Sequence, residues 1–173
     1  MFRLLLLLIA VSGTWPTACQ PLFGDEPVTA KPVTAIPDKL LVLTFDDSAK
    51  SHFTIVRPLL KEHGFGATFF ITEGFDFRDN KKDYMTWEEI RTLHDDGFEI
   101  GNHTRDHMGV TEASLDRLSE QIEAVNSECL KHGIPRPVSF AYPGNSIHPK
   151  ALPILTAAGF KFARRGGSPE YPY

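Results

Sequence analysis

The feature that most constrains the fold of this chain is an alternation of short apolar runs with longer amphipathic stretches, beginning at Leu40. Strands that alternate with helices form parallel sheets, because each helix carries the chain back to start the next strand in the same direction. We therefore predict an α/β fold. The expected strands are residues 40–45, 67–71, 98–102, 138–142 and 160–163. The expected helices are residues 53–63, 86–97, 114–132 and 149–158.

Local signals mark the ends of these helices. Thr86 and Glu89 have the spacing of a capping box, which predicts a helix beginning there. A glycine, favoured just past a helix C-terminus, closes each expected helix: Gly64, Gly97, Gly133 and Gly159. Pro153 falls inside the last helix and is expected in its first turn, where a missing N–H costs least.

Acidic and imidazole side chains follow two of the expected strands. Asp46 and Asp47 come after the first strand, and His103 ends the third, with His107 four residues later. The carboxyl ends of parallel strands meet at one edge, where active sites collect. Two imidazoles and one carboxylate are a ligand set typical of a catalytic divalent metal, and the neighbouring carboxylate can act as a base. Because adjacent strand residues point to opposite faces, both aspartates must lie just past the strand end.

Each motif has a simpler interpretation when taken alone. Asp-Asp-Ser after a strand is commonly a helix cap and a solvated turn, and two histidines one helical turn apart are common on surfaces. The residues from Tyr142 to Asn145 also form an ordinary turn sequence. Their occurrence together, each after its own strand, favours a metal-dependent hydrolase.

The three motifs, in this order, resemble those of the polysaccharide deacetylases, the NodB-homology domains of carbohydrate esterase family 4. Residues 44–48 (Thr-Phe-Asp-Asp-Ser) are similar to the first motif of the family. Residues 103–107 match H-[ST]-x-x-H, and residues 140–145 (Phe-Ala-Tyr-Pro-Gly-Asn) resemble a variant of the third motif. The resemblance runs from about Leu40 to the C-terminus and implies a distorted (β/α) barrel of the NodB type, incomplete at its C-terminal side.

The resemblance also implies functions for particular residues: Asp46 as the catalytic base, Asp47, His103 and His107 as metal ligands, and Tyr142, Pro143, Gly144 and Asn145 as substrate-binding residues. It implies a divalent metal, zinc first, with cobalt, nickel or iron as alternatives by ligand type. The implied reaction is hydrolysis of an N-acetyl or O-acetyl group on an acetylated glycan. Backbone N–H groups near Tyr142 are candidate donors to the oxyanion.

The sequence departs from the family pattern in two places. The third motif usually begins with an Arg that orients the base, whereas residues 139–141 are Ser-Phe-Ala. The family also carries later motifs, one with an Asp and one Leu-x-His whose His is the general acid, and neither follows Tyr142. We therefore expect a C-terminally truncated member that is at most weakly active, with residues 160–163 as an exposed edge strand bearing apolar side chains such as Phe160 and Phe162.

The N-terminal residues predict export. A basic start, an apolar run over residues 4–11 and small residues beyond have the pattern of a signal peptide, too short to span a bilayer stably. We expect a signal peptide over residues 1–19, a linker over 20–39 and a partial deacetylase domain over 40–173. The expected location is periplasmic or extracellular, with lipid attachment at Cys19 as a minor alternative.

Composition limits the partners. A chain of 173 residues suits one catalytic domain. Its net charge is -4 and its sequence contains no basic block, which disfavours binding to nucleic acid or to an anionic membrane surface. Cys129 lies in a helical pattern and is expected to be a buried structural thiol, with no internal disulfide. Nothing in the sequence specifies an oligomeric state.

Other functions fit part of the sequence. An inactive carbohydrate-binding relative would keep the metal site without turnover, and a deacylase could act on a small C–N amide instead of a glycan. A glycosidase would need two carboxyl groups about 5–9.5 Å apart and has no use for the histidine pair. Metal content separates the glycosidase from the other classes, and acetate release separates an enzyme from a binder.

Overall fold

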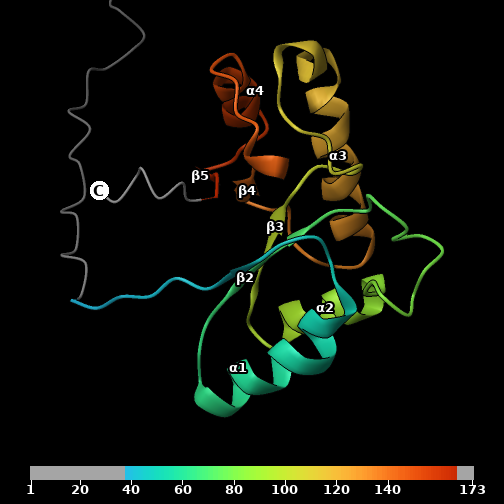
Figure 1. The fold of residues 1–173 in the computed structure, drawn as a ribbon, viewed down its shortest axis with the longest axis vertical. Coiled ribbons are helices and arrows are strands. Elements are labelled where there is room, and N and C mark those ends of the chain that lie inside the picture. The colour runs from blue at the N-terminus through green and yellow to red at the C-terminus, as the bar shows by residue number, and fades with distance from the viewer. Residues whose placement is uncertain (1–37, 167–173) are drawn as a thin grey trace, which may run out of the picture. The chain divides into compact units, whose positions relative to one another are not determined.

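The computed structural model describes residues 38–166 and shows one parallel sheet (Figure 1). Its strands are β1 (Thr44–Phe45), β2 (Thr68–Ile71), β3 (Glu99–Asn102), β4 (Ser139–Ala141) and β5 (Phe162–Arg164). They are arranged in sequence order, and every neighbouring pair is parallel. The predicted α/β fold is confirmed. The expected signal peptide, with Cys19, and the linker before Asp38 lie outside the described residues.

Helices connect the strands. They are α1 (Arg57–His63), α2 (Trp87–Asp95), α3 (Leu115–Lys131) and α4 (Ala151–Ala157), with a π-helical turn η1 (His52–Val56) before α1 and two 3₁₀ turns, η2 (Glu112–Ser114) and η3 (Pro143–Asn145). None of these helices is long and apolar enough to cross a membrane, within the part of the chain that the structure describes.

The strand order explains why the helices lie on one side of the sheet. Right-handed crossovers that always step to the next strand in the same direction place every helix on the same face, as in a (β/α) barrel. One core cluster joins α1 and α2 to β2 through residues such as Phe69 and Ile90. A second joins α3 and α4 to β4 through Leu118, Phe140 and Leu155. The sheet is therefore an open, curled half-barrel with its helices outside.

The first expected strand is shorter than predicted. Of residues 40–45 only Thr44 and Phe45 form β1, and Leu40, Leu41 and Val42 are 60%, 77% and 71% exposed. β1 is an edge strand, and β2 begins only opposite Thr44, so the residues before Leu43 have no neighbouring strand to pair with. The apolar run was a correct signal for a strand but not for its length.

The helix signals are confirmed with one difference. Thr86 and Glu89 form the capping box, and Pro153 is the third residue of α4. The first helical segment is π-helical over η1 before it becomes α1. Pro58 lies near this junction and has no N–H to donate to the preceding turn, which accounts for the change of helix type there.

The fifth strand lies at the other edge of the sheet. It begins at Phe162, which is 59% exposed, and not at Phe160 as predicted. Phe160 instead packs on Phe140, with ring centroids 5.5 Å apart, so only Phe162 is the exposed apolar side chain that we expected. Cys129 is a buried free thiol whose pKa is raised by burial to about 12, in agreement with its expected structural role.

Gly101 provides a test of packing on the inner face of the sheet. A Cβ at Gly101 would lie 2.4 Å from Cδ1 of Phe70, a side chain that is 1% exposed. We expect Gly101→Ala to lower the free energy of unfolding by about 1–3 kcal/mol, because this core has no room for another carbon. Gly66→Ala is the control, since nothing lies within 4 Å of its Cβ position. Chemical denaturation of both variants makes the comparison, and equal stability would contradict this description of the inner face.

Candidate metal centre

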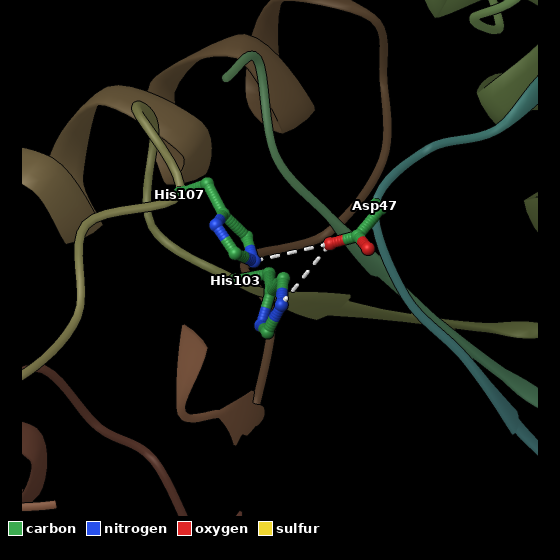
Figure 2. A group of neighbouring side chains, drawn as sticks. All are labelled: Asp47, His103 and His107. Atoms are coloured by element: carbon green, nitrogen blue, oxygen red, sulfur yellow. Dashed lines mark ion pairs between the residues drawn. The ribbon is translucent and has the colours of Figure 1, made fainter. Parts of the chain in front are cut away.

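Three side chains converge at the carboxyl end of the sheet (Figure 2). The Nε2 atoms of His103 and His107 lie 3.4 Å and 3.2 Å from Oδ1 of Asp47. One ligand atom from each residue lies within 4.8 Å of the other two. The structure thus brings together the three residues that the sequence suggested as metal ligands.

The donor set fits a divalent cation. Oδ1 of Asp47 is buried and has no hydrogen-bond partner among the described residues. A buried polar atom without a partner is costly, and both imidazoles point their Nε2 atoms at this oxygen. One carboxylate oxygen and two imidazole nitrogens are the ligand types that zinc and similar metals bind.

His103 is oriented by the next strand. Its ring is buried, and its Nδ1 lies 2.8 Å from the carbonyl oxygen of Ala141, at the end of β4. Nδ1 therefore carries the proton, which leaves the lone pair of Nε2 directed toward Asp47. Burial lowers the pKa of His103, although the hydrogen bond to Ala141 opposes this effect. The neutral imidazole, the form that binds metals, is thereby favoured.

His107 is positioned through its main chain. Its N–H donates to Oγ1 of Thr72, over 3.0 Å, and the N–H of Gly74 donates to the same hydroxyl. That hydroxyl donates in turn to the carbonyl oxygen of Arg105. The loop after β2 therefore fixes the loop after β3 that carries both histidines.

Ser48 attaches the aspartate loop to the same residue. Its buried Oγ donates to the carbonyl oxygen of Thr72, over 2.8 Å, and accepts from the N–H of Thr72, over 3.0 Å. Taken alone, the Asp-Asp-Ser sequence indicated only a helix cap and a solvated turn. In the structure it links the loop of Asp47 to β2, and Thr72 connects all three loops around the centre.

Backbone strain is concentrated here. Seven non-glycine residues have positive φ in the described part of the chain, and six of them lie in the segments that follow β1 to β4: Asp47, Ser48, Phe75, Thr104, His107 and Asn145. Such conformations are uncommon for residues with a Cβ and persist where the surroundings fix them. The φ of 70° at Asp47 turns the chain directly after Asp46. This turn past the strand end is where we expected the two aspartates to lie.

Asp46 lies outside the three-residue group and forms an ion pair with Arg164, at the end of β5. The guanidinium also lies over the ring of Phe70, 4.9 Å from its centroid. The sequence showed no Arg in the third motif, and Arg164 is 118 positions from Asp46. Only its place at the end of an expected strand could have indicated it.

The four residues expected to bind substrate lie at the end of β4. Tyr142 and Pro143 are buried, whereas Gly144 and Asn145 are exposed in η3. The hydroxyl of Tyr142 is buried without a partner among the described residues, and burial raises its pKa. Gly144 and Asn145 are therefore the two that this segment presents to solvent, and a substrate contact by any of the four stays a prediction.

Comparison with known proteins identifies the family. The polysaccharide deacetylase family model matches residues 34–163, and the chain belongs to this family. It is 33% identical over 95 residues to a peptidoglycan-N-acetylmuramic acid deacetylase of Bacillus subtilis, covering 54% of this chain and 34% of the relative. It is 27% identical over 125 residues to a peptidoglycan-N-acetylglucosamine deacetylase of Bacillus cereus, covering 72% and 55%. The chain thus spans about a third to a half of the length of these relatives.

Solved structures show the same fold. IcaB from Ammonifex degensii matches with a TM-score of 0.66 and 24% identity, over 80% of this chain and 66% of that one. A family 4 carbohydrate esterase from Streptomyces lividans matches with a TM-score of 0.59 and 19% identity, over 70% and 60%. The half-barrel is therefore a NodB-type distorted (β/α) barrel, incomplete relative to these neighbours.

Gly74 tests how the histidine loop is held. A Cβ there would lie 2.8 Å from the carbonyl carbon of Asp106 and 2.8 Å from Cβ of His107. Because neither atom can rotate away, we expect Gly74→Ala to displace His107 and weaken metal binding by about tenfold or more. Titration with zinc or cobalt measures the loss, with Gly66→Ala as the control. Unchanged affinity in Gly74→Ala would show that this contact does not position a ligand.

Proposed function

We propose that this chain removes acetyl groups, N-acetyl in the first place, from an acetylated polysaccharide. The observation that carries the proposal is the convergence of Asp47, His103 and His107 beside the carboxylate of Asp46, in a chain of the polysaccharide deacetylase family. Family membership supports the reaction class, and the geometry supports candidates for the metal ligands, the base and the oxyanion donor, although not for the general acid.

Asp47, His103 and His107 would hold the divalent cation, zinc first, with cobalt, nickel and iron as alternatives. When bound, such a cation polarises the acetyl carbonyl and lowers the pKa of a water molecule from its bulk value toward about 7. The buried, unpartnered Oδ1 of Asp47 and the fixed tautomer of His103 support this assignment.

Asp46 is the proposed base that takes the proton of the attacking water. Its side chain is 31% exposed, so a water molecule can reach it, and it is not one of the three converging ligands. Arg164 holds the carboxylate from the far edge of the sheet, which is the orienting function expected of the Arg that the third motif lacks. Orientation of this kind matters because small displacements of a catalytic group cost much of its effect.

The structure reduces the number of backbone N–H groups that are candidate donors to the oxyanion. In residues 142–146, the N–H of Tyr142 donates to the carbonyl oxygen of Arg164, and those of Asn145 and Ser146 donate within the turn. The N–H of Tyr142 itself is therefore already bonded, which leaves the neighbouring N–H groups as candidates. Gly144, exposed and with its N–H in none of these bonds, is the proposed donor to the developing negative charge.

The proposed partner is an acetylated glycan, with no nucleic acid. Both curated relatives are named for deacetylation of peptidoglycan, which favours a cell-wall glycan over chitin oligomers, an exopolysaccharide or acetylated xylan. A glycan outside the cytoplasm agrees with the proposed signal peptide over residues 1–19. A carbohydrate-binding relative without turnover is the second candidate, because the converging group contains metal ligands and none of the described residues is assigned as the general acid.

The two aspartates should respond differently to substitution. We expect Asp46→Asn to abolish acetate release from acetylated glycans, by about 100-fold or more, while metal content stays intact. Asp47→Asn should lose the metal, because it removes a ligand charge. Metal analysis and an acetate assay on the same samples make the test. Equal metal loss in both variants would show that these assignments are wrong, and metal binding without acetate release by the unaltered chain would favour the binding relative.

Arg164 should affect turnover without affecting the metal. We expect Arg164→Met to lower kcat by about tenfold to a hundredfold, with Arg164→Lys less impaired because it keeps the positive charge. Arg136→Met is the control, since Arg136 pairs with Glu123 on the exposed surface. Acetate release, metal content and thermal melting are compared. A kcat for Arg164→Met equal to that of the control would remove Arg164 from the mechanism.

A further inference from the structure

An exposed aromatic ring lies against the metal centre. Phe75 is 58% exposed, and its ring centroid lies 4.7 Å from that of His107, at an angle of 38°. The ring is nearly parallel to that of Tyr84, with an interplanar angle of 10° and centroids 6.2 Å apart. One proposed ligand is therefore bordered by the exposed ring of Phe75, and Tyr84 is stacked with that ring.

Folding alone does not account for Phe75. Its φ is 58°, a left-handed conformation that is strained for a bulky residue, and its large apolar side chain gains little burial in return. The same turn buries Phe77, which is 2% exposed, so this segment already has its core anchor. A strained backbone that presents an apolar ring to solvent next to a site is typical of a binding residue.

Both rings are fixed relative to the centre. The N–H of Glu73, two residues before Phe75, donates to the carbonyl oxygen of Arg105 in the histidine loop, over 2.8 Å. Tyr84 forms a bridge with Ala49 in the segment that follows Asp47. Each ring is thus carried by a segment that is hydrogen-bonded to a loop bearing a metal ligand, so the rings are placed before any substrate arrives.

We propose that the exposed ring of Phe75, supported by the partly buried ring of Tyr84, forms a platform for a pyranose ring of the glycan chain, at a position next to the acetylated sugar. The faces of a pyranose carry C–H bonds, whose weakly positive hydrogens suit the negative face of an aromatic ring, while its hydroxyl groups stay in water. The proposal rests on the proposed function, since it assigns the substrate class of the same site. Binding energy from such a neighbouring sugar helps to hold the reacting group in place.

The surroundings favour a sugar over a protein partner. Asp76, Arg78 and Asp79 follow Phe75 on the same turn and are all exposed, so charged side chains border the aromatic surface. A stable protein interface buries about 800 Å² on each partner, far more than two rings supply. A single pyranose ring is of the size of this surface.

The test compares Phe75→Asn with Phe65→Asn. Asn tolerates positive φ, so the first variant removes the ring without imposing new strain. Phe65 is 57% exposed, nearly the same fraction as Phe75. Among the described residues no contact joins Phe65 to the metal centre, so Phe65→Asn is the matched control. A third variant, Phe75→Tyr, keeps the ring. Binding of a soluble N-acetylated oligomer of the peptidoglycan glycan chain to the zinc-loaded chain is measured by calorimetry, with metal content determined on the same samples.

We expect Phe75→Asn to weaken oligomer binding by about threefold to tenfold, while Phe65→Asn and Phe75→Tyr bind as the unaltered chain does. Equal binding by Phe75→Asn and the control overturns the platform, as does a loss that accompanies loss of metal. Acetate release is read separately. If binding depends on Phe75 but no acetate is released, the platform proposal stands and the deacetylase proposal is refuted. If Phe75→Asn releases acetate from the oligomer as efficiently as the unaltered chain, only the platform proposal is refuted.

Discussion

The hydrogen bonds of Thr72 are the interaction on which the candidate centre depends. Its main chain exchanges two hydrogen bonds with the hydroxyl of Ser48, and its own hydroxyl accepts from the N–H of His107. Thr72 is fully buried, so these bonds are not weakened by water. One residue after β2 thereby fixes the loops after β1 and β3, and the positions of Asp47 and His107 follow from it.

Curvature of the sheet brings Arg164 to Asp46, a contact that the hydrogen bonds between the loops do not provide. β1 and β5 are opposite edges of a five-stranded sheet, yet Asp46 after β1 pairs with Arg164 in β5. This contact requires the sheet to curl until its two edges approach at the carboxyl end. The half-barrel therefore brings a cation to the proposed base from a strand that a flat sheet would hold far away. We propose that Arg164 in this strand takes the place of the Arg that the third motif lacks.

Some residues around the centre are buried and held in place, whereas others are exposed to solvent. His103 is buried and hydrogen-bonded to the carbonyl oxygen of Ala141, so its imidazole is held in one orientation. Phe75 is exposed beside His107, and Gly144 is exposed in η3, after β4. In the proposed function, the fixed residues position the metal and the exposed residues contact the glycan beside the reacting group.

The sequence by itself determined the elements and the edge at which the chemistry lies. Periodicity, the Thr86 capping box and the closing glycines act within a few residues, so the helices and the parallel order could be predicted, and with them the meeting of Asp47 with His103. Only the tertiary structure decided that residues 40–42 stay exposed, that Arg164 pairs with Asp46, and that Phe75 faces solvent beside His107. These contacts depend on where β2 begins and on how the sheet curls, and neither has a local signal in the chain.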